Sequence, residues 1–423
     1  MAQLSDDCFA FSGPLMPIEA AERLIAQRVV PLAETEQIAL AAARGRVLAA
    51  DLIAPIDLPP FVNSAVDGYA VRHGDLDPLA ETALCVTDRV PAGRAGAPLG
   101  PREASRIFTG APMPEGADTV FMQEDCRREG ERVIVPPGLK RGANRRLAGE
   151  DIKAGSLALP AGRRLRPADL ALAAALGDTA ISVRRAVRVA LFSTGDEIVE
   201  PGAALPPARI YDSNRLLLLT LLQNFAAAVT DLGILADDPR AMRDALAMAA
   251  TEHDLIITSG GVSTGEADHV RGALEDIGRL VFWRLGIKPG RPVAMGVVPG
   301  LAPETGAAFV GLPGNPVAVF VTFARIVRPL LLRLAGAAPE PLMAYPVHAG
   351  FPYKKKKGRR EYVRVSLQRG ADGTLQAMKH PREGAGVISS LTETDGLAEL
   401  GDDVTAIEPG AMIGFIPYAA LTG

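Results

Sequence analysis

The spacing of apolar residues changes several times along the chain, and each change predicts a different kind of element. Residues 17–30 and 164–177 place apolar side chains at helical spacing. Gly177 at the end of the second segment suits the residue that follows a helix. A further short helix is predicted over residues 37–44.

A different pattern separates the two helical segments. From residue 51 onward, short apolar runs alternate with clusters of turn residues, which predicts a β-rich insertion. Because helical sequence lies on both sides of it, we predict a discontinuous helical domain, formed by residues 1–50 and 144–185. The inserted β-domain would then cover residues 51–143.

From residue 186 to 336, predicted strands alternate with helices of 10 to 15 residues. This alternation predicts a doubly wound α/β sheet with parallel strands. One helix, over residues 212–225, begins with Asp212 or Ser213 as its N-cap. The last part, residues 337–423, lacks long helical periodicity and predicts a small β-domain. Its strands are expected at 361–367, 375–378 and 412–417.

Composition narrows the class of protein. The chain has 423 residues, 48% hydrophobic and 22% charged, which is typical of a globular protein with two to four domains. A net charge of −4 gives no reason to expect nucleic acid or an anionic membrane as partner. No run of about 18 apolar residues predicts a membrane span. The N-terminus carries acids where a signal peptide has basic residues, and the three scattered cysteines predict no disulfide framework, so we expect a cytoplasmic protein.

Polar and glycine-rich segments follow four of the predicted strands. In open parallel sheets, ligands bind beyond the carboxyl ends of the strands. We therefore expect segments that are distant in sequence to meet at one edge of the sheet. These segments are 193–197, 236–239, 258–268 and 311–316.

The segment TSGGVSTGEAD contains the most residues that could bind a ligand. Gly260 and Gly261 can take a positive φ and allow a ligand close to the backbone, and the helix that follows offers free N–H groups to an anion. Ser263 and Glu266 also have the spacing of a capping box, so Glu266 has a structural alternative. Asp268 has no part in such a cap and is the preferred functional acid.

A second turn of this kind has the sequence GLPGNP. A helix start explains Asn315 as N-cap and Pro316 as the first helical residue. It does not explain Pro313 and Gly314 at the end of an apolar strand. We interpret the turn as a second place where an anion could bind.

Charged residues near these turns suggest a metal and a phosphate. Glu197, Asp237 and Asp268 each follow a predicted strand, and carboxylates suit Mg²⁺ that bridges substrate phosphates. Each acid alone is also compatible with a solvated turn. Lys288 and Arg291 could neutralise a phosphate, and exposed turn residues are their alternative.

The stretch KKKKGRR at 354–360 has six basic residues. A solvated hairpin tip is the simpler interpretation. A patch that attracts an anionic substrate is the alternative.

Eight motifs together resemble one family. In chain order they are PPFVNSAVDGYAV, IFTGAPMPEGADTV, RGANRRLAGEDI, ALFSTGDEI, IYDSNR, DLIITSGGVSTGEAD, WRLGIKPGRP and GLPGNP. They resemble the molybdopterin molybdenumtransferases, the MoeA family, which is related to the E domain of gephyrin. The resemblance implies a discontinuous helical domain, an inserted β-domain, a molybdopterin-binding α/β domain and a C-terminal β-barrel. It also implies a homodimer with an active site shared between protomers.

The resemblance implies a reaction as well. The family takes adenylated molybdopterin and molybdate, releases AMP and inserts molybdenum to form the molybdenum cofactor, with Mg²⁺. Carried over by motif, Glu197, Asp237 and Asp268 are the carboxylates of the metal and catalytic site, and Thr109 is a catalytic hydroxyl. The residues implied for the substrate are Asp67, Gly260, Gly261, Ser263, Pro313, Gly314 and Asn315, with Lys288, Arg291 and Arg359 as oxyanion contacts.

Two positions depart from the family pattern. Val62 stands where the family usually has an aspartate, and Ala385 stands where a serine is common. Neither side chain can bind a metal or donate to molybdate. A non-catalytic paralogue that binds molybdopterin or anchors other cofactor-biosynthesis proteins is therefore the alternative function, and a nucleotide pyrophosphatase is a third.

Overall fold

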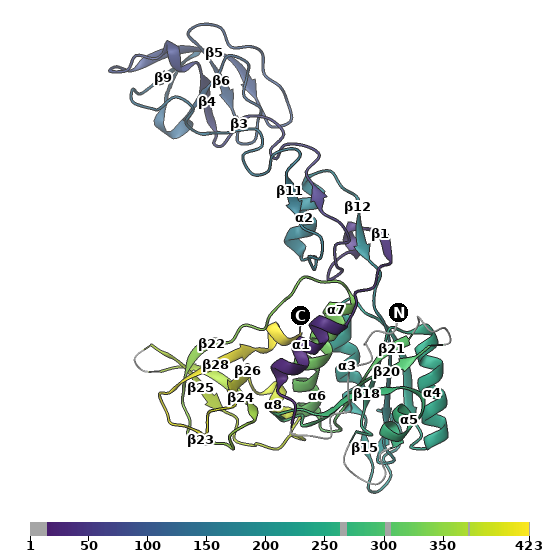
Figure 1. The fold of residues 1–423 in the computed structure, drawn as a ribbon. Helices are drawn as coiled ribbons and strands as arrows, with labels where there is room; N and C mark the ends of the chain where they lie inside the picture. The colour runs from purple at the N-terminus through teal and green to yellow at the C-terminus, as the bar shows by residue number, and fades with distance from the viewer. Residues whose placement is uncertain (1–14, 263–268, 301–305, 371–372, 423) are drawn as a thin grey trace. The chain divides into compact units, whose positions relative to one another are not determined.

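The computed structural model describes residues 15–262, 269–300, 306–370 and 373–422, and these divide into two compact units (Figure 1). The insertion unit contains residues 50–160 and 167–180. The α/β unit contains the rest of the described chain, from both sides of the insertion. The finer division into four domains stays a prediction.

A six-stranded sheet forms the centre of the α/β unit. Its order is β16 (Ala228–Leu235), β13 (Arg188–Thr194), β17 (Leu255–Ser259), β21 (Gly306–Leu312), β20 (Pro292–Pro299) and β18 (Arg279–Arg284). The first four strands run parallel, whereas β20 and β18 pair antiparallel. The predicted doubly wound architecture is confirmed, with two antiparallel strands added. The links between β18, β20 and β21 are too short for a crossover helix, so these strands turn back on one another.

Helices cover both faces of this sheet (Figure 1). Leu191 of β13 packs in a hydrophobic cluster with the helices on one face of the sheet. Its neighbours Ala190 and Phe192 pack with Met242 and Leu246 on the other face. Strands buried on both faces give continuous apolar runs in the sequence. The first face carries α1 (Ile18–Arg28), α3 (Ser213–Gln223), α6 (Pro316–Thr322) and α7 (Arg328–Leu334), and the π-helical turn Phe323–Val327 joins α6 to α7. The second face carries α4 (Pro239–Glu252) and α5 (His269–Ile277).

Acidic residues begin two of these helices. Asp212 caps α3 by accepting from the backbone N–H of Arg215 at 3.1 Å. Asp238 caps α4 by accepting from the N–H groups of Arg240 and Ala241 at 3.0 and 2.8 Å, and Pro239 takes the first helical position. The turns between the strand ends and these helices are therefore fixed.

A closed five-stranded barrel follows the sheet. Its strands are β22 (Tyr345–Ala349), β24 (Arg360–Arg369), β25 (Leu375–Lys379), β26 (Gly396–Leu400) and β28 (Met412–Pro417), and the pairing of β24 with β26 closes it. Smaller elements of the barrel are β23 (Tyr353–Lys354), β27 (Ala406–Ile407), α8 (Ser389–Thr392) and α9 (Tyr418–Thr422). The two-residue strand β19 (Ile287–Lys288) pairs in parallel with β24 and so joins the barrel to the α/β sheet.

The short apolar runs of the insertion unit form a second six-stranded sheet. Its order is β7 (Thr119–Met122), β4 (Gly68–Val71), β6 (Glu103–Ile107), β5 (Thr82–Val90), β9 (Arg132–Val135) and β8 (Arg127–Glu129). The minor pairs are β2 (Leu52–Ile53) with β11 (Leu157–Leu159) and β3 (Asn63–Ser64) with β10 (Arg145–Arg146). Helix α2 (Pro167–Ala175) ends before Gly177, whose φ of +99° confirms the predicted stop.

The helix predicted over residues 37–44 is wrong. The chain forms β1 (Thr35–Ala39) and a 3₁₀ turn over Leu40–Ala42. β1 pairs with β12 (Ala180–Arg184), which lies about 140 residues further on. Pairing with so distant a strand overrides the weak helical preference of an alanine-rich segment.

Within the part of the chain that the structure describes, no helix has the length and apolar character needed to cross a membrane.

Candidate functional site

The carboxyl ends of four parallel strands lie side by side and bring the predicted segments together. Asp237 follows β16 and Glu197 follows β13, the neighbouring strand. Gly260 follows β17 and Pro313 follows β21, which continue the same edge. With strands about 4.8 Å apart, three steps across the sheet span about 15 Å. The edge is therefore long enough for an extended ligand.

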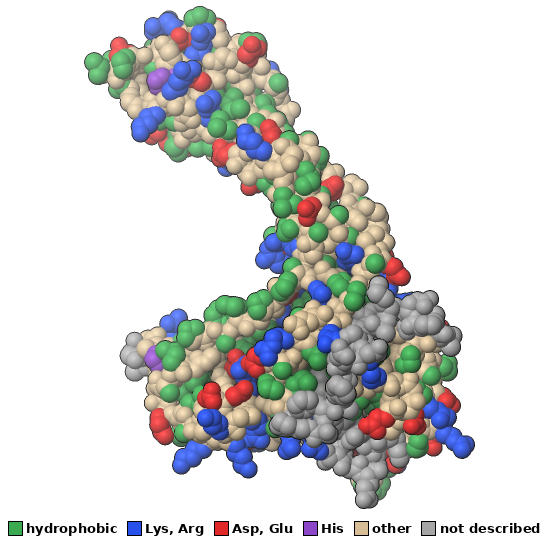
Figure 2. All heavy atoms as spheres, in the orientation of Figure 1, with side chains coloured by type: hydrophobic (Ala, Val, Ile, Leu, Met, Phe, Trp, Pro, Cys, Tyr) green, Lys and Arg blue, Asp and Glu red, His purple; other side chains and the backbone are tan. Residues whose placement is uncertain are grey.

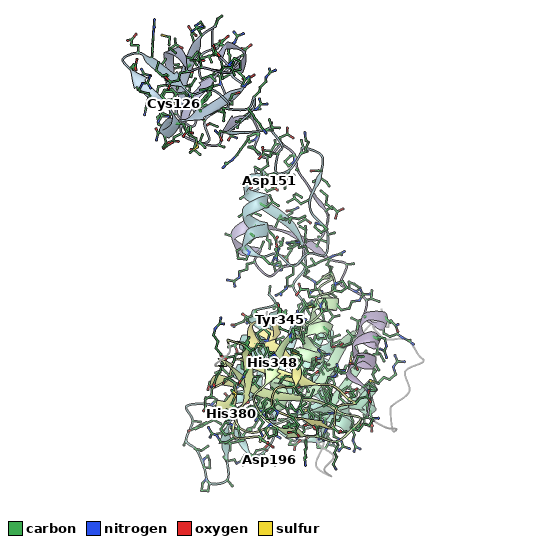
Figure 3. The ribbon with its side chains drawn as sticks, turned by 90° about the vertical axis from the view of Figure 1, so that its left-hand side faces the viewer. Cys126, Asp151, Asp196, Tyr345, His348 and His380 are labelled. Atoms are coloured by element: carbon green, nitrogen blue, oxygen red, sulfur yellow. The ribbon has the colours of Figure 1, made fainter. Side chains whose placement is uncertain are left out.

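Glu197 lies in the loop that leaves β13, beside Asp196 (Figure 3). Two short parallel strands, β14 (Ile198–Val199) and β15 (Ile210–Tyr211), shape this loop, and the carbonyl of Glu197 accepts the N–H of Ile210 at 2.8 Å. The exposed Glu197 carboxylate lies over Gly195, where a Cβ would come within 2.6 Å of Oε2. A side chain at position 195 would displace this carboxylate.

A nearly buried arginine anchors the Glu197 loop. Arg215 is 9% exposed; its guanidinium donates to Asp231 at 2.7 Å and to Asp212 at 3.2 Å, and it pairs with Glu200. Burial opposes the charge of Arg215, but the hydrogen bonds to Asp231 and Asp212 outweigh burial and raise its pKa. Glu200 belongs to the Glu197 loop and Asp231 to β16, so this cluster ties together the two segments that carry Glu197 and Asp237.

The third predicted carboxylate, Asp268, lies outside the described residues, as do Ser263 and Glu266. Among the residues that the structure does describe, no group of three or more His, Cys, Asp or Glu residues is arranged to hold a metal ion. Glu197 and Asp237 are thus two hard oxygen donors from adjacent strands.

The predicted glycine turn is present at the end of β17. Gly260 and Gly261 have φ values of +90° and +66°. A Cβ on Gly260 would lie 2.3 Å from the carbonyl oxygen of Thr194, and the Gly260 N–H donates to the carbonyl of Leu312 at 3.0 Å. Glycine is required here because the turn takes a positive φ and passes so close to the next strand.

Buried polar groups without partners gather at the same edge. The described residues supply no hydrogen-bond partner to Ser193 Oγ, Thr194 Oγ1, Thr258 Oγ1 and Asn214 Oδ1. Buried polar atoms are normally paired, so such a group indicates the place of a polar ligand. Asn214 also donates to Ser259 Oγ at 3.0 Å and to the carbonyl of Gly314 at 2.7 Å.

These polar residues were not among the predicted site residues. A signal was present, because hydroxyl side chains end two apolar strands, and Asn214 lies in the IYDSNR motif.

A basic pocket of about 230 Å³ lies between the sheet and the barrel. Five predicted residues line it: Lys288, Arg291, Pro313, Asn315 and Arg359. Asn315 begins α6, yet its side chain makes no hydrogen bond to that helix, so the capping alternative does not account for it. The pocket residues that were not predicted include Tyr353, Glu361, Arg364, Lys379, His380, Arg382 and Glu383.

Glu361 organises two of the pocket cations. Its side chain is 1% exposed and accepts from Lys288 Nζ at 3.2 Å and Arg359 Nη2 at 2.6 Å. The Tyr353 hydroxyl donates to the same carboxylate at 2.8 Å. Burial opposes ionisation of Glu361, but the hydrogen bonds from Arg359 and Tyr353 prevail and lower its pKa. One buried carboxylate therefore fixes the direction of both cations.

Positive charge dominates the pocket. Six Lys and Arg residues and two Glu residues line it. Arg364 is buried and donates to Ser390 Oγ and to the carbonyl of Arg382, each at 2.9 Å, and burial lowers its pKa. His380, labelled in Figure 3, lies 2.9 Å from Glu393 through Nε2. Such a lining favours a compact oxyanion.

The basic run at 354–360 is only partly a solvated tip. Lys355 Nζ donates to the carbonyls of Gly401 and Val404 at 2.8 and 2.7 Å, and Arg359 points to Glu361. The solvated interpretation is therefore wrong for these two residues. Exposed basic side chains do gather around β23 in Figure 2.

Thr109 and Asp67 belong to the insertion unit and contact each other there. The backbone N–H and the hydroxyl of Thr109 both donate to Asp67 Oδ1, each at 2.8 Å. Val62, one of the two departures from the family pattern, lies in the same segment as Asp67.

The fold and the edge of the sheet define an α/β protein whose strand ends suit an extended, partly anionic ligand. Three family models cover most of the chain: the MoeA N-terminal region (domain I and II) at 16–177, a probable molybdopterin binding domain at 190–333 and the MoeA C-terminal region (domain IV) at 346–418.

Individual relatives agree with these models. A molybdopterin molybdenumtransferase of Haemophilus influenzae is 36% identical over 96% of this chain and 99% of its own length. A molybdopterin molybdenumtransferase of Nostoc is 37% identical over 89% of this chain and 87% of its own length. A solved molybdopterin biosynthesis moeA protein from Pyrococcus horikoshii superimposes with a TM-score of 0.80 at 28% identity, over 96% of this chain and 100% of that chain. The chain belongs to the MoeA family of molybdopterin molybdenumtransferases, the transferases that insert molybdenum into molybdopterin in cofactor biosynthesis.

Proposed function

We propose that this chain uses adenylated molybdopterin and molybdate, and that it releases AMP as it inserts the metal. The observation that carries the proposal is the arrangement along one sheet edge: carboxylates at the β16 and β13 ends, a glycine turn at the β17 end, buried hydroxyls without described partners on β13 and β17, and the basic pocket beyond β21. The substrate has matching parts, since it joins a pterin to a nucleotide through a pyrophosphate.

Different groups of residues at this edge would bind different parts of the substrate. Gly260 and Gly261 let the pyrophosphate approach the backbone. Asn214 and the free hydroxyls would bind polar atoms of the nucleotide. Lys288 and Arg359, held by Glu361, would bind molybdate, which is a substrate and a compact dianion.

Glu197 and Asp237, with Asp268, would hold Mg²⁺. The donor set fits this ion, because carboxylates from adjacent strands leave room for waters and phosphate oxygens. When bound, Mg²⁺ would neutralise the pyrophosphate charge as AMP leaves. We also propose a homodimer, and a cytoplasmic location.

The decisive assay supplies the purified chain with adenylated molybdopterin, molybdate and Mg²⁺, and measures AMP and active cofactor. We expect both products from the unaltered chain. Asp268→Ala should reduce turnover at least a hundredfold while the thermal unfolding temperature stays the same, since a lost metal ligand removes charge stabilisation from the reacting phosphate. An unaltered chain that binds substrate and releases no AMP would instead support the non-catalytic paralogue.

Position 385 offers a second test. Ala385 lines the basic pocket, and the family resemblance implies a serine hydroxyl at this place. We expect Ala385→Ser to lower the KM for molybdate about fivefold, because one added hydrogen bond is worth about 1 kcal/mol. Steady-state kinetics with varied molybdate would measure this change, and Ala411→Ser, elsewhere in the barrel, is the matched control. An unchanged KM would mean that position 385 does not contact molybdate.

A further inference from the structure

A second pocket of the α/β unit, of about 370 Å³, is lined by helices α1 and α7, which lie side by side in Figure 1, and by the loop of residues 337–342. It shares no lining residue with the basic pocket. Apolar residues form most of its wall, and Pro329, Pro339 and Pro341 are among them. A proline holds its φ fixed, so this wall is stiff. An apolar pocket with a few polar groups is the usual form of a small-molecule site.

Two arginines enter this pocket from a π-helical turn. The turn Phe323–Val327 carries Arg325, and Arg328 follows directly after it. Pro329 gives a local cause for the turn, because it has no N–H for the carbonyl of Arg325 and its ring would clash with that carbonyl in a regular α-helix. The N–H of Arg328 donates instead to the carbonyl of Phe323, five residues earlier. Turns of this kind are frequent at functional sites.

Both arginines are buried and keep a donor without a partner. Arg325 and Arg328 are 7% and 6% exposed. Arg325 pairs with Glu22 of α1 at 2.9 Å, and Arg328 donates to the carbonyl and the carboxylate of Glu340 at 2.9 and 3.3 Å. The described residues offer no acceptor to the Nε–H of either arginine. Buried donors are normally paired and are costly when they are not, so two such groups in one pocket indicate a polar ligand.

The charges of the lining select the kind of ligand. Three arginines and two glutamates line the pocket, which leaves one positive charge in excess. The third arginine, Arg333, donates through Nε to the carbonyl of Val29 at 2.9 Å. Glu22 and Glu340 would repel a dianion such as phosphate. A carboxylate carries one charge and two acceptor oxygens, which matches two single N–H donors.

The interior of the pocket is poor in water. Burial raises the pKa of the Glu22 carboxyl and lowers the pKa of the Arg328 guanidinium. In such surroundings a hydrogen bond between charged groups is stronger than it is in water.

The loop that closes one side of the pocket is already fixed. Glu340 accepts from Nε and Nη2 of Arg164, each at 3.0 Å, in addition to its contacts with Arg328. The N–H of Ala338 donates to the carbonyl of Gly162 at 2.7 Å. A ligand therefore meets a preformed pocket and has little of the chain to order when it binds.

We propose that this pocket binds a small organic monocarboxylate with an aromatic or branched apolar body. The carboxylate oxygens accept the free Nε–H groups of Arg325 and Arg328, and the body packs on the proline-rich wall. The proposal is independent of the proposed function, because none of these residues belongs to the sheet edge or to the basic pocket.

The test is calorimetric titration of the full chain with benzoate, in the absence of molybdopterin and Mg²⁺. We expect a Kd of about 1 mM or lower, which a ligand of this size can reach in a preformed pocket. Benzamide, which has the same shape and no charge, should bind about tenfold more weakly or worse. Saturating molybdate should leave the affinity for benzoate unchanged.

Variants locate the binding. Ala26→Phe fills the pocket from an exposed position of α1 and keeps both arginines, so it should raise the Kd for benzoate about tenfold or more while the thermal unfolding temperature stays the same. Gln27→Phe is the matched control, because Gln27 is the next exposed residue of α1 and does not line the pocket. Arg325→Met and Arg328→Met should each weaken binding about tenfold or more, through the lost N–H donor.

Four results would overturn the proposal. The first is the absence of saturable benzoate binding to the unaltered chain. The second is an affinity that Ala26→Phe leaves unchanged, and the third is competition by molybdate, which would place benzoate in the basic pocket. The fourth is a change of oligomeric state in Ala26→Phe, measured by light scattering, because the pocket would then be covered by a second copy of the chain.

Discussion

Replacing Glu361 by alanine should both weaken the fold and disable the basic pocket. The change removes the carboxylate that accepts from Lys288, Tyr353 and Arg359, and leaves cations in a partly buried space. Removing one partner of such a buried group typically costs about 3 kcal/mol of unfolding free energy. We expect the KM for molybdate to rise at least tenfold as well, since both cations lose their orientation.

Denaturant unfolding and molybdate kinetics would measure the two effects. Glu408→Ala, which changes an exposed glutamate of the barrel, is the matched control and should change neither quantity.

The folded pKa of Glu361 is lowered, so its contribution to stability is present above the unfolded carboxyl pKa of about 4.3. That contribution is lost as the pH falls through the lower folded pKa. A variant with normal stability and normal molybdate KM would show that Glu361 does not organise the pocket.

Replacing Arg215 by methionine should have an effect of similar size through a different route. The variant leaves Glu200, Asp212 and Asp231 without the cation that they share. We expect a loss of about 3 kcal/mol of unfolding free energy from the uncompensated carboxylates. Turnover should fall at least tenfold, because the loop that carries Glu197 loses its tether to β16 and the metal ligands lose their alignment.

Arg215→Lys separates charge from geometry. A lysine keeps the charge but cannot hold three carboxylates in a planar fork, so we expect stability to recover more than turnover. Arg209→Gln is the control, because Arg209 is an exposed arginine of the loop that carries Glu197. Thermal unfolding and AMP release would be measured side by side. If turnover recovered fully in Arg215→Lys, the fork geometry would be irrelevant to Glu197.

The sequence predicted features that depend on local pattern. The spacing of apolar residues predicted the order of strands and helices in the α/β sheet. Turn residues at the strand ends predicted the turns at Gly260 and Pro313 and their position at one edge of the sheet. Asp212, one of the two predicted N-caps, begins α3, whereas the cap formed by Asp238 on α4 was not predicted. Lys288 and Arg291 were predicted as anion contacts, and both line the pocket.

Features that depend on distant pairing could not be predicted in the same way. Glu361 occurs in a strand pattern, and its role appears only when β24 lies beside β19, more than 70 residues earlier. The 37–44 segment has helical composition, and its pairing with β12 is equally remote in sequence. Residues 263–268, which contain Asp268, lie outside the described part of the chain, so the role of this acid still rests on the sequence.

The pairing of β19 with β24 has a consequence for cooperativity. Lys288 lies directly opposite Glu361 in this two-residue bridge, so one of the contacts that attach the barrel is also a wall of the basic pocket. An oxyanion that binds there requires the bridge to be closed. By mass action, its binding free energy is then added to the attachment of the barrel. Occupancy of the pocket would therefore strengthen the attachment of the barrel, which also packs on the core of the α/β sheet through Tyr362, Leu397 and Ile416.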